Sequence, residues 1–157
     1  MSRCDTKTVV WFCRRLPARL ENLSAFIDGV SESAREKGVG EDIIGRIQLA
    51  LEEALVNVFR HAYPESPGDV VVELRREGRN RLSIEITDWG TAFDLTGARA
   101  PDLSLGVEER KVGGLGIFLI RQMTDAMDQR RQGDSNILTL EVRTDGTPAG
   151  DSETDAG

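Results

Sequence analysis

Two polar side chains at helical spacing are the first candidates for chemistry in this 157-residue sequence. Glu53 and Asn57 are four residues apart within the stretch EDIIGRIQLALEEALVNVFRHAY, residues 41–63, so on a helix they would lie one above the other. Small Ala50 and Ala54 lie beside them and would leave room for a ligand over the helix. A purely structural helix does not need this arrangement. Ordinary solvated polar residues are the alternative explanation, and this helix alone does not decide between the two.

Asp88 is a second candidate, because it continues the alternating apolar series of residues 82–86 and therefore points to the same inward face where the strand ends. A carboxylate aimed toward a core must find a hydrogen-bond donor or cost several kcal/mol. Gly90, two residues later, allows close backbone approach. The amino edge of a bound base would supply the donor, while a turn residue that caps the loop is the alternative.

The glycine-rich stretch GGLG, residues 113–116, directly precedes an apolar helix. The free N–H groups and the positive dipole end of such a helix start suit a phosphate group. A flexible loop end is the alternative explanation.

The elements that must position these groups follow from apolar periodicity and turn residues. We expect a strand at 8–13, a helix from Pro17 to about 37, the central helix at 41–63, and a hairpin of strands at 70–75 and 82–86. A loop at 94–113, a helix at 117–127 with Phe118, Leu119, Met123 and Met127 available for the core, and a last strand at 137–142 complete the order.

This order predicts an α+β fold, a two-layer sandwich in which a mixed, mostly antiparallel sheet carries its helices on one face. The central helix should bury Ile43, Ile47, Ala50, Leu51, Ala54, Leu55 and Val58. Residues 1–143 are expected to form one domain, and the acidic residues 144–157 are expected to be a disordered tail.

Composition excludes several classes of protein. With 39% hydrophobic and 30% charged residues and no apolar run near about 18 residues, the chain is expected to be a cytoplasmic globular protein without a membrane span or signal peptide. The net charge of -7 argues against nucleic acid as the main partner. Cys4 and Cys13 lack metal-site or redox spacing and are expected to be reduced thiols.

The three motifs together resemble the three boxes of the GHKL ATPase superfamily, also called the Bergerat or histidine-kinase-like ATPase fold. EALVNVFRHAY (residues 53–63), DWGTAFD (88–94) and GGLGIFLIRQMTD (113–125) are similar to the anti-sigma-factor serine kinases of the RsbW and SpoIIAB type. Each box alone is a weak signal, whereas three boxes in the same order are a strong one. The resemblance covers about residues 8–143.

The resemblance implies roles for individual residues in binding ATP and Mg²⁺. Asn57 matches the family's Mg²⁺ ligand and Glu53 its catalytic acid, which could take the proton from an attacking serine hydroxyl. Asp88 matches the adenine-reading carboxylate and Gly90 the glycine beneath the base. The remaining nucleotide-binding positions that it implies are Ala92, Arg110, Lys111, Gly113, Gly114, Leu115 and Gly116.

Two departures from the family pattern accompany the resemblance. Ala92 stands where many GHKL proteins have a second glycine, which a small residue can replace in this subfamily. Arg110 and Lys111 belong to the segment that corresponds to the ATP lid, but they do not align with the family's lid arginine. For His61, at the end of the central helix, we favour a structural role.

The function implied by the resemblance is that of a serine/threonine protein kinase that switches partners. It would hold a sigma factor or similar target and phosphorylate a STAS-domain antagonist on serine. A nucleotide-gated binding module with little or no kinase activity is the alternative, and a detached histidine-kinase catalytic domain is a weaker one. The resemblance also implies a homodimer, although cover by the chain's own first helix is the favoured use of Leu49, Val56 and Phe59.

Overall fold

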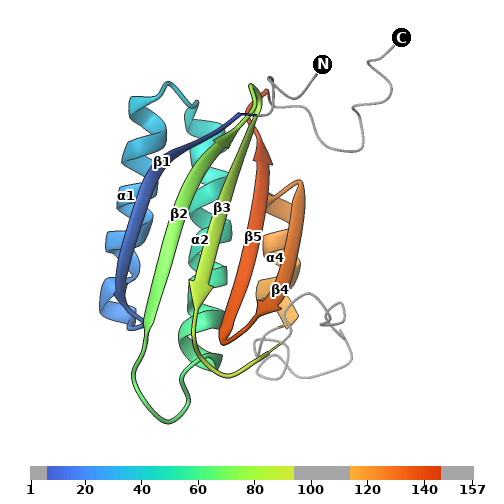
Figure 1. Ribbon diagram of the computed structural model, residues 1–157. Coiled ribbons are helices and arrows are strands. Elements are labelled where there is room, and N and C mark those ends of the chain that lie inside the picture. Colours follow the sequence, from blue (N-terminus) through green and yellow to red (C-terminus); the bar gives the residue numbers. More distant parts are fainter. Residues whose placement is uncertain (1–6, 94–113, 146–157) are drawn as a thin grey trace.

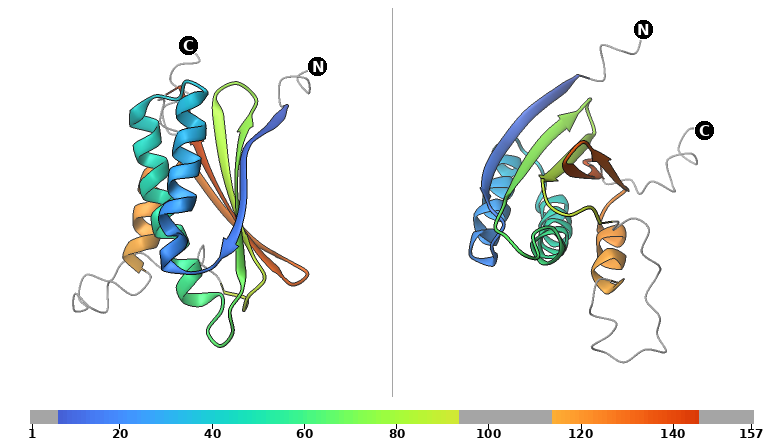
Figure 2. Two further views of the ribbon diagram at one scale, coloured as in Figure 1. Left: turned by 90° about the vertical axis from the view of Figure 1, so that its left-hand side faces the viewer. Right: turned by 60° about the horizontal axis from the view of Figure 1, so that its bottom comes forward.

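The computed structural model describes residues 7–93 and 114–145. Within these ranges, the strands form one five-stranded sheet in the order β1-β2-β3-β5-β4, and Figures 1 and 2 show the helices on one face of it. The elements are β1 (Thr8–Pro17), the short 3-10 helix η2 (Leu20–Asn22), α1 (Leu23–Glu36), α2 (Glu41–His61), β2 (Asp69–Glu77), β3 (Arg81–Asp88), α4 (Gly114–Met123), β4 (Ala126–Gln132) and β5 (Ser135–Arg143). The loop at 94–113 and the tail from residue 146 lie outside the described residues.

The predicted α+β sandwich is confirmed: one layer is the sheet and the other is made of α1, α2 and α4 (Figure 2). All four strand pairings are antiparallel, so the sheet is not mixed in the described part of the chain. No helix of this part is long and apolar enough to span a membrane.

The core lies between α2 and the inward-facing residues of the sheet. Every residue predicted for the apolar stripe of α2 is buried, and Ile44 is buried with them. The alternating residues of β2 and β3 face this helix layer and are fully or almost fully buried, as their period of two predicted. These strand residues are Val70, Val72, Leu74, Leu82, Ile84 and Ile86.

The opposite face of the sheet is more polar, as expected. Arg75 donates hydrogen bonds from one nitrogen to Glu73 at 2.7 Å and to Glu85 at 2.9 Å. These half-buried charges join neighbouring strands β2 and β3 on the face that no helix covers.

The first strand is longer than predicted and the first helix begins later. β1 continues to Pro17 because it is an edge strand whose charged side chains can remain in solvent, and Arg15 there forms an ion pair with Asp69 of β2 at 2.9 Å. Pro17 therefore ends a strand, a position that tolerates a missing N–H, and does not open a helix. The chain then makes the η2 turn before α1 starts at Leu23.

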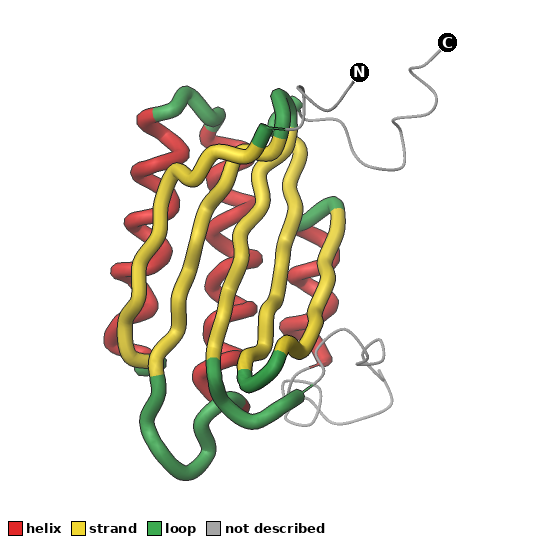
Figure 3. The backbone as a smooth tube through the Cα atoms, viewed as in Figure 1, coloured by secondary structure: helices red, strands yellow, loops and turns green. Residues whose placement is uncertain are grey.

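The predicted helix at 117–127 is wrong at both ends. α4 begins earlier, at Gly114, and ends at Met123; Thr124 then donates its side-chain hydroxyl to the Ile120 carbonyl, and the backbone N–H of Asp125 bonds to β5. The following residues form β4, which pairs with β5 at the sheet edge (Figure 3). Met127 reaches the core from this strand and not from a helix.

The buried side of α4 also differs from the expectation. Ile117 and Ile120 are 2% and 0% exposed, whereas Phe118 is 44% exposed and Leu119 is half-buried. The helix packs beside α2, and positions 117 and 120, three apart, lie on the same side of it.

This packing predicts opposite outcomes for two apolar residues of α4. Ile120→Ala should lower the free energy of unfolding by about 2–5 kcal/mol, because it removes buried methylenes and leaves a cavity. Phe118→Ala should change it by less than about 1 kcal/mol. Urea unfolding of both variants would measure the difference, and a larger loss for Phe118→Ala would contradict the described orientation of α4.

Candidate functional site

Asn57 lies at the edge of the buried face of α2 and is only 3% exposed. Its Nδ2 donates a hydrogen bond of 2.8 Å to the Glu53 backbone carbonyl, one turn earlier. Its Oδ1 is buried and accepts no hydrogen bond within the described residues. Because the amide nitrogen is held by the helix, the oxygen is presented to whatever lies beside α2.

Glu53 lies one turn before Asn57 and is half-buried. Within the described ranges its carboxylate makes no hydrogen bond or ion pair. Burial raises the pKa of Glu53, the nearby Glu52 carboxylate raises this pKa further, and Arg60 lowers it. A carboxylate with a raised pKa is a stronger proton acceptor than an ordinary surface glutamate.

The glycine-rich start of α4 lies directly against this pair. A Cβ atom added to Gly116 would lie 3.0 Å from Asn57 Nδ2 and 3.1 Å from Glu53 Oε1. Any larger residue would therefore crowd both side chains. The fold thus brings the first and third motifs together, since the first turn of α4, where backbone N–H groups lack helical partners, adjoins the carboxylate and the amide.

Asp88 ends β3 on the inward face, as predicted, and is 1% exposed. Its Oδ1 accepts hydrogen bonds from the Gly90 backbone N–H at 2.9 Å and from Asn136 Nδ2 at 2.8 Å. Its Oδ2 accepts none from the described residues. Burial raises the pKa of Asp88, while the hydrogen bonds from Asn136 and Gly90 and the charge of Arg131 act in the opposite direction.

Gly90 allows the segment after β3 to lie against the end of α2. A Cβ atom at this position would overlap the backbone carbonyl of Ala62, whose oxygen accepts a hydrogen bond of 2.7 Å from the Thr91 N–H. The contact with the end of α2 therefore requires a glycine at this position. Ala62 is five residues after Asn57, which corresponds to about 7.5 Å along a helix axis. The second motif, at the end of β3, therefore contacts the C-terminal end of α2 close to Asn57.

Two polar residues that the sequence did not single out complete the surroundings of Asp88. Asn136 of β5 is 3% exposed and donates to Asp88, and Arg131 of β4 donates to the Asn136 side chain and to the Gly90 carbonyl. One signal for Asn136 was present, because it continues the inward series Leu138, Leu140 and Val142 as Asp88 continues that of β3. Arg131 had no such signal, since its strand was not predicted.

The structure describes only some of the remaining predicted site residues. Ala92 lies in the described segment after β3 and is exposed. Gly114 begins α4, whereas Arg110, Lys111 and Gly113 lie outside the described residues. His61 is half-buried and its ring packs against Phe93 at 5.8 Å between centroids, a contact compatible with the structural role expected for it.

The described residues are suited to a metal ion that takes one ligand from the protein and the others from a bound phosphate group. Within residues 7–93 and 114–145, no group of three or more His, Cys, Asp and Glu side chains could hold a metal ion by itself. The buried Asn57 oxygen without a partner is a suitable single ligand for a hard cation such as Mg²⁺, which takes few protein ligands when phosphate supplies the others.

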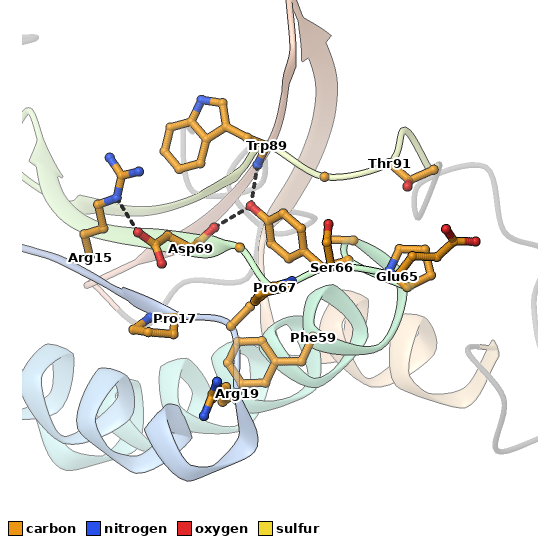
Figure 4. A pocket seen from close by; sticks show the side chains of 16 residues that line it. Arg15, Pro17, Arg19, Phe59, Glu65, Ser66, Pro67, Asp69, Trp89 and Thr91 are labelled. Atoms are coloured by element: carbon orange, nitrogen blue, oxygen red, sulfur yellow. Dashed lines mark hydrogen bonds and ion pairs between the residues drawn. The ribbon is translucent and has the colours of Figure 1, made fainter.

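An open pocket of about 1320 Å³ lies beside the segment that follows Asp88. Trp89, Phe59 and the loop after α2 contribute to its walls (Figure 4). Tyr63 joins them, because its hydroxyl donates to the Asp69 carbonyl and accepts from the Trp89 N–H. Of the predicted site residues that the structure describes, only Gly90 lines this pocket, so the pocket is distinct from the Glu53 and Asn57 pair.

Comparison with known proteins identifies relatives of this chain. The chain is 28% identical over 144 residues to proteins named serine-protein kinase RsbW from Bacillus cereus (strain AH820) and Bacillus anthracis, covering 85% of this chain and 89% of each relative. A solved structure of the RsbU and RsbW domains of a Mycobacterium tuberculosis protein has the same fold, with a TM-score of 0.59 and 16% identity. That match covers 84% of this chain and 32% of the larger one.

The region shared with the family model is almost the whole described fold, from the end of β1 to the end of β5. It includes all three motifs. The model for the histidine kinase-like ATPase domain matches residues 16–142, and the chain therefore belongs to the histidine kinase-like ATPase domain family.

Proposed function

We propose that this protein is an ATP- and Mg²⁺-dependent protein-serine kinase that acts as a partner-switching regulator of the anti-sigma-factor type. The observation that carries the proposal is the buried oxygen of Asn57, which has no hydrogen-bond partner among the described residues and lies beside the Glu53 carboxylate and the first turn of α4. A metal ligand, a proton acceptor and a phosphate-binding helix start are thereby adjacent. The similarity to proteins named serine-protein kinase RsbW supports the same activity.

In this proposal, Glu53 accepts the proton of the serine hydroxyl that attacks the terminal phosphate of ATP. Its raised pKa favours this role, because a general base works best when its pKa lies near the working pH. Asn57 would hold Mg²⁺, which when bound neutralises phosphate charge. The backbone N–H groups at Gly114 and Gly116 would bind phosphate oxygens. Gly113, Leu115, Arg110 and Lys111 are proposed to join them.

Asp88 is proposed to read the base. Its Oδ1 is held by two donors, and Oδ2 has no hydrogen bond within the described residues. An ionised acceptor at this position pairs with the 6-amino group of adenine and repels the 6-carbonyl of guanine. Gly90 and Ala92, which follow it, would lie near the base.

The partners are proposed from the family resemblance. We infer a sigma factor or equivalent target, a STAS-domain antagonist as the phosphorylated protein, and a homodimer as the assembly. The second candidate function is a nucleotide-gated binding protein with little kinase activity. The Glu53 carboxylate, half-buried against the start of α4, favours the kinase.

The metal assignment predicts that Asn57→Ala weakens ATP binding only when Mg²⁺ is present. The affinity in Mg²⁺ should fall by at least about tenfold, since loss of a ligand should cost no less than loss of a supporting contact. The affinity in EDTA should not change. Calorimetric titration under both conditions measures this, and equal affinity of the variant and the wild type in Mg²⁺ would remove Asn57 as the ligand.

The role of Asp88 in adenine recognition predicts that Asp88→Asn weakens ATP binding without lowering stability. ATP affinity should fall by about ten- to a hundredfold, because the amide replaces a charged acceptor near the base. Stability at pH 7 should equal or exceed that of the wild type, because the amide oxygen can accept both hydrogen bonds made by Oδ1 without a buried charge. ATP titration and thermal melting measure the two quantities.

The sign of the stability effect follows from the pKa. Burial raises the pKa of Asp88 in the folded state, so its contribution to stability is full below the ordinary value of about 3.9 and decreases as the pH rises through the raised value. The melting temperatures of Asp88→Asn and the wild type should therefore converge in acid. A variant that melts well below the wild type at pH 7 would show that the charge is needed for folding.

The catalytic assignment predicts that Glu53→Ala binds ATP and the partner normally but transfers phosphate about 10²- to 10⁴-fold more slowly. The wild-type rate should fall as the pH decreases through the raised pKa of Glu53. The assay uses labelled ATP with the copurified partner and measures phosphoserine.

Glu52→Ala is the matched control, because Glu52 is the exposed neighbour of Glu53 on α2. Its only expected effect is a lower pKa of Glu53, so the rate should stay nearly unchanged at a pH above that pKa. Transfer by Glu53→Ala at the wild-type rate would mean that another group is the base. If the wild type transfers no phosphate while ATP still changes its partner affinity, the gated binding protein is the correct function.

A further inference from the structure

Three polar side chains form a row across the end of the sheet. In the strand register, Asp88 of β3 is opposite Asn136 of β5, and Asn136 is opposite Arg131 of the edge strand β4. The next inward positions along β3 and β5 are the fully apolar Ile86 and Leu138. The row therefore lies where the core ends and the proposed base site begins.

Both polar atoms of the Asn136 amide are hydrogen-bonded, to the row and to the segment after β3. Its Nδ2 donates to Asp88 Oδ1 at 2.8 Å and to the Thr91 carbonyl at 3.0 Å, and its Oδ1 accepts from Arg131 Nη1 at 3.1 Å. A guanidinium can only donate and a carboxylate oxygen can only accept. Arg131 on one side and Asp88 on the other therefore allow a single orientation of the amide.

Arg131 also holds the backbone beside the base site. The same Nη1 donates to the Gly90 carbonyl at 2.9 Å, while Nε is anchored on the Gly133 carbonyl at 3.2 Å. Two residues earlier on β4, Gln129 donates to the Phe93 carbonyl at 2.9 Å. The edge strand thus contacts both ends of the described segment 90–93.

We propose that Arg131 is a positioning residue for base recognition, which acts through Asn136 and Gly90 on the Asp88 carboxylate. Asn136 occupies Oδ1, and this leaves Oδ2 to the amino group of the base. Arg131 keeps the Asn136 amide from flipping and keeps the Gly90 turn in place. The inference rests on the proposed ATP-binding function and adds to it the origin of adenine selectivity.

Arg131 is exposed, so water can replace its hydrogen bonds to Asn136 and Gly90 when it is removed, and the variant should fold. Selectivity for the 6-amino group is the readout that a merely structural role would not change. The experiment compares binding of ATP with binding of purine riboside triphosphate, which lacks that group. Calorimetric titration gives the ratio of the two affinities for each variant, and thermal melting checks the fold.

Arg131→Leu should reduce this affinity ratio by about tenfold, while leaving the affinity for the purine analogue and the melting temperature near the wild-type values. Arg131→Lys should retain part of the ratio, because a single ammonium can still donate to one of the two acceptors. Arg130→Leu is the matched control, because Arg130 is the exposed neighbour on β4 with no hydrogen bond to the base segment among the described residues. It should leave the ratio unchanged.

A double-mutant cycle then tests whether Arg131 acts through Asp88. In an Asp88→Asn background, Arg131→Leu should not change the ratio further, since the carboxylate that it positions is absent. An unchanged ratio in Arg131→Leu, or an equal loss for both nucleotides, would overturn this inference alone. A wild type that binds no ATP would overturn the proposed function as well.

Discussion

Burial of the apolar face of α2 forces the polar residues at its edge to be buried too, and the arrangement of the site depends on this constraint. Leu51, Ala54 and Leu55 are completely inaccessible, and Asn57 on the same helix is almost so. An unpaired buried oxygen costs about 1–3 kcal/mol. The helix tolerates this cost because its apolar contacts are many. A bound cation at Asn57 Oδ1 would offset it.

Burial also acts on two carboxylates, with different consequences. It raises the pKa of Glu53 and the pKa of Asp88. For Glu53, a raised pKa suits the proposed general base. Asp88 must stay ionised to accept a hydrogen bond from a base, and Asn136, the Gly90 N–H and Arg131 all oppose the rise in its pKa. The polar row at the end of the sheet therefore compensates for the depth at which Asp88 lies.

The sequence by itself determined the fold class, the buried stripe of α2, the inward residues of the central hairpin and the family. These properties follow from local periodicity and short motifs, since a helix or strand with one buried face must repeat apolar residues at its own period. It also indicated that Glu53 and Asn57 share one side of α2 and that Asp88 points inward. Assignment of these residues to metal, base and catalysis still rests on resemblance and geometry together.

Only the tertiary structure decided what depends on contacts between distant parts of the chain. β4 has the sequence AMDQRRQ, which carries no apolar alternation, so it is a strand because β5 offers backbone partners and solvent accepts its charges. Without β4, neither Arg131 nor the role of Asn136 could be predicted. The closeness of Gly116 to Glu53 and Asn57 likewise arises from the packing of α4 on α2, which no local pattern encodes.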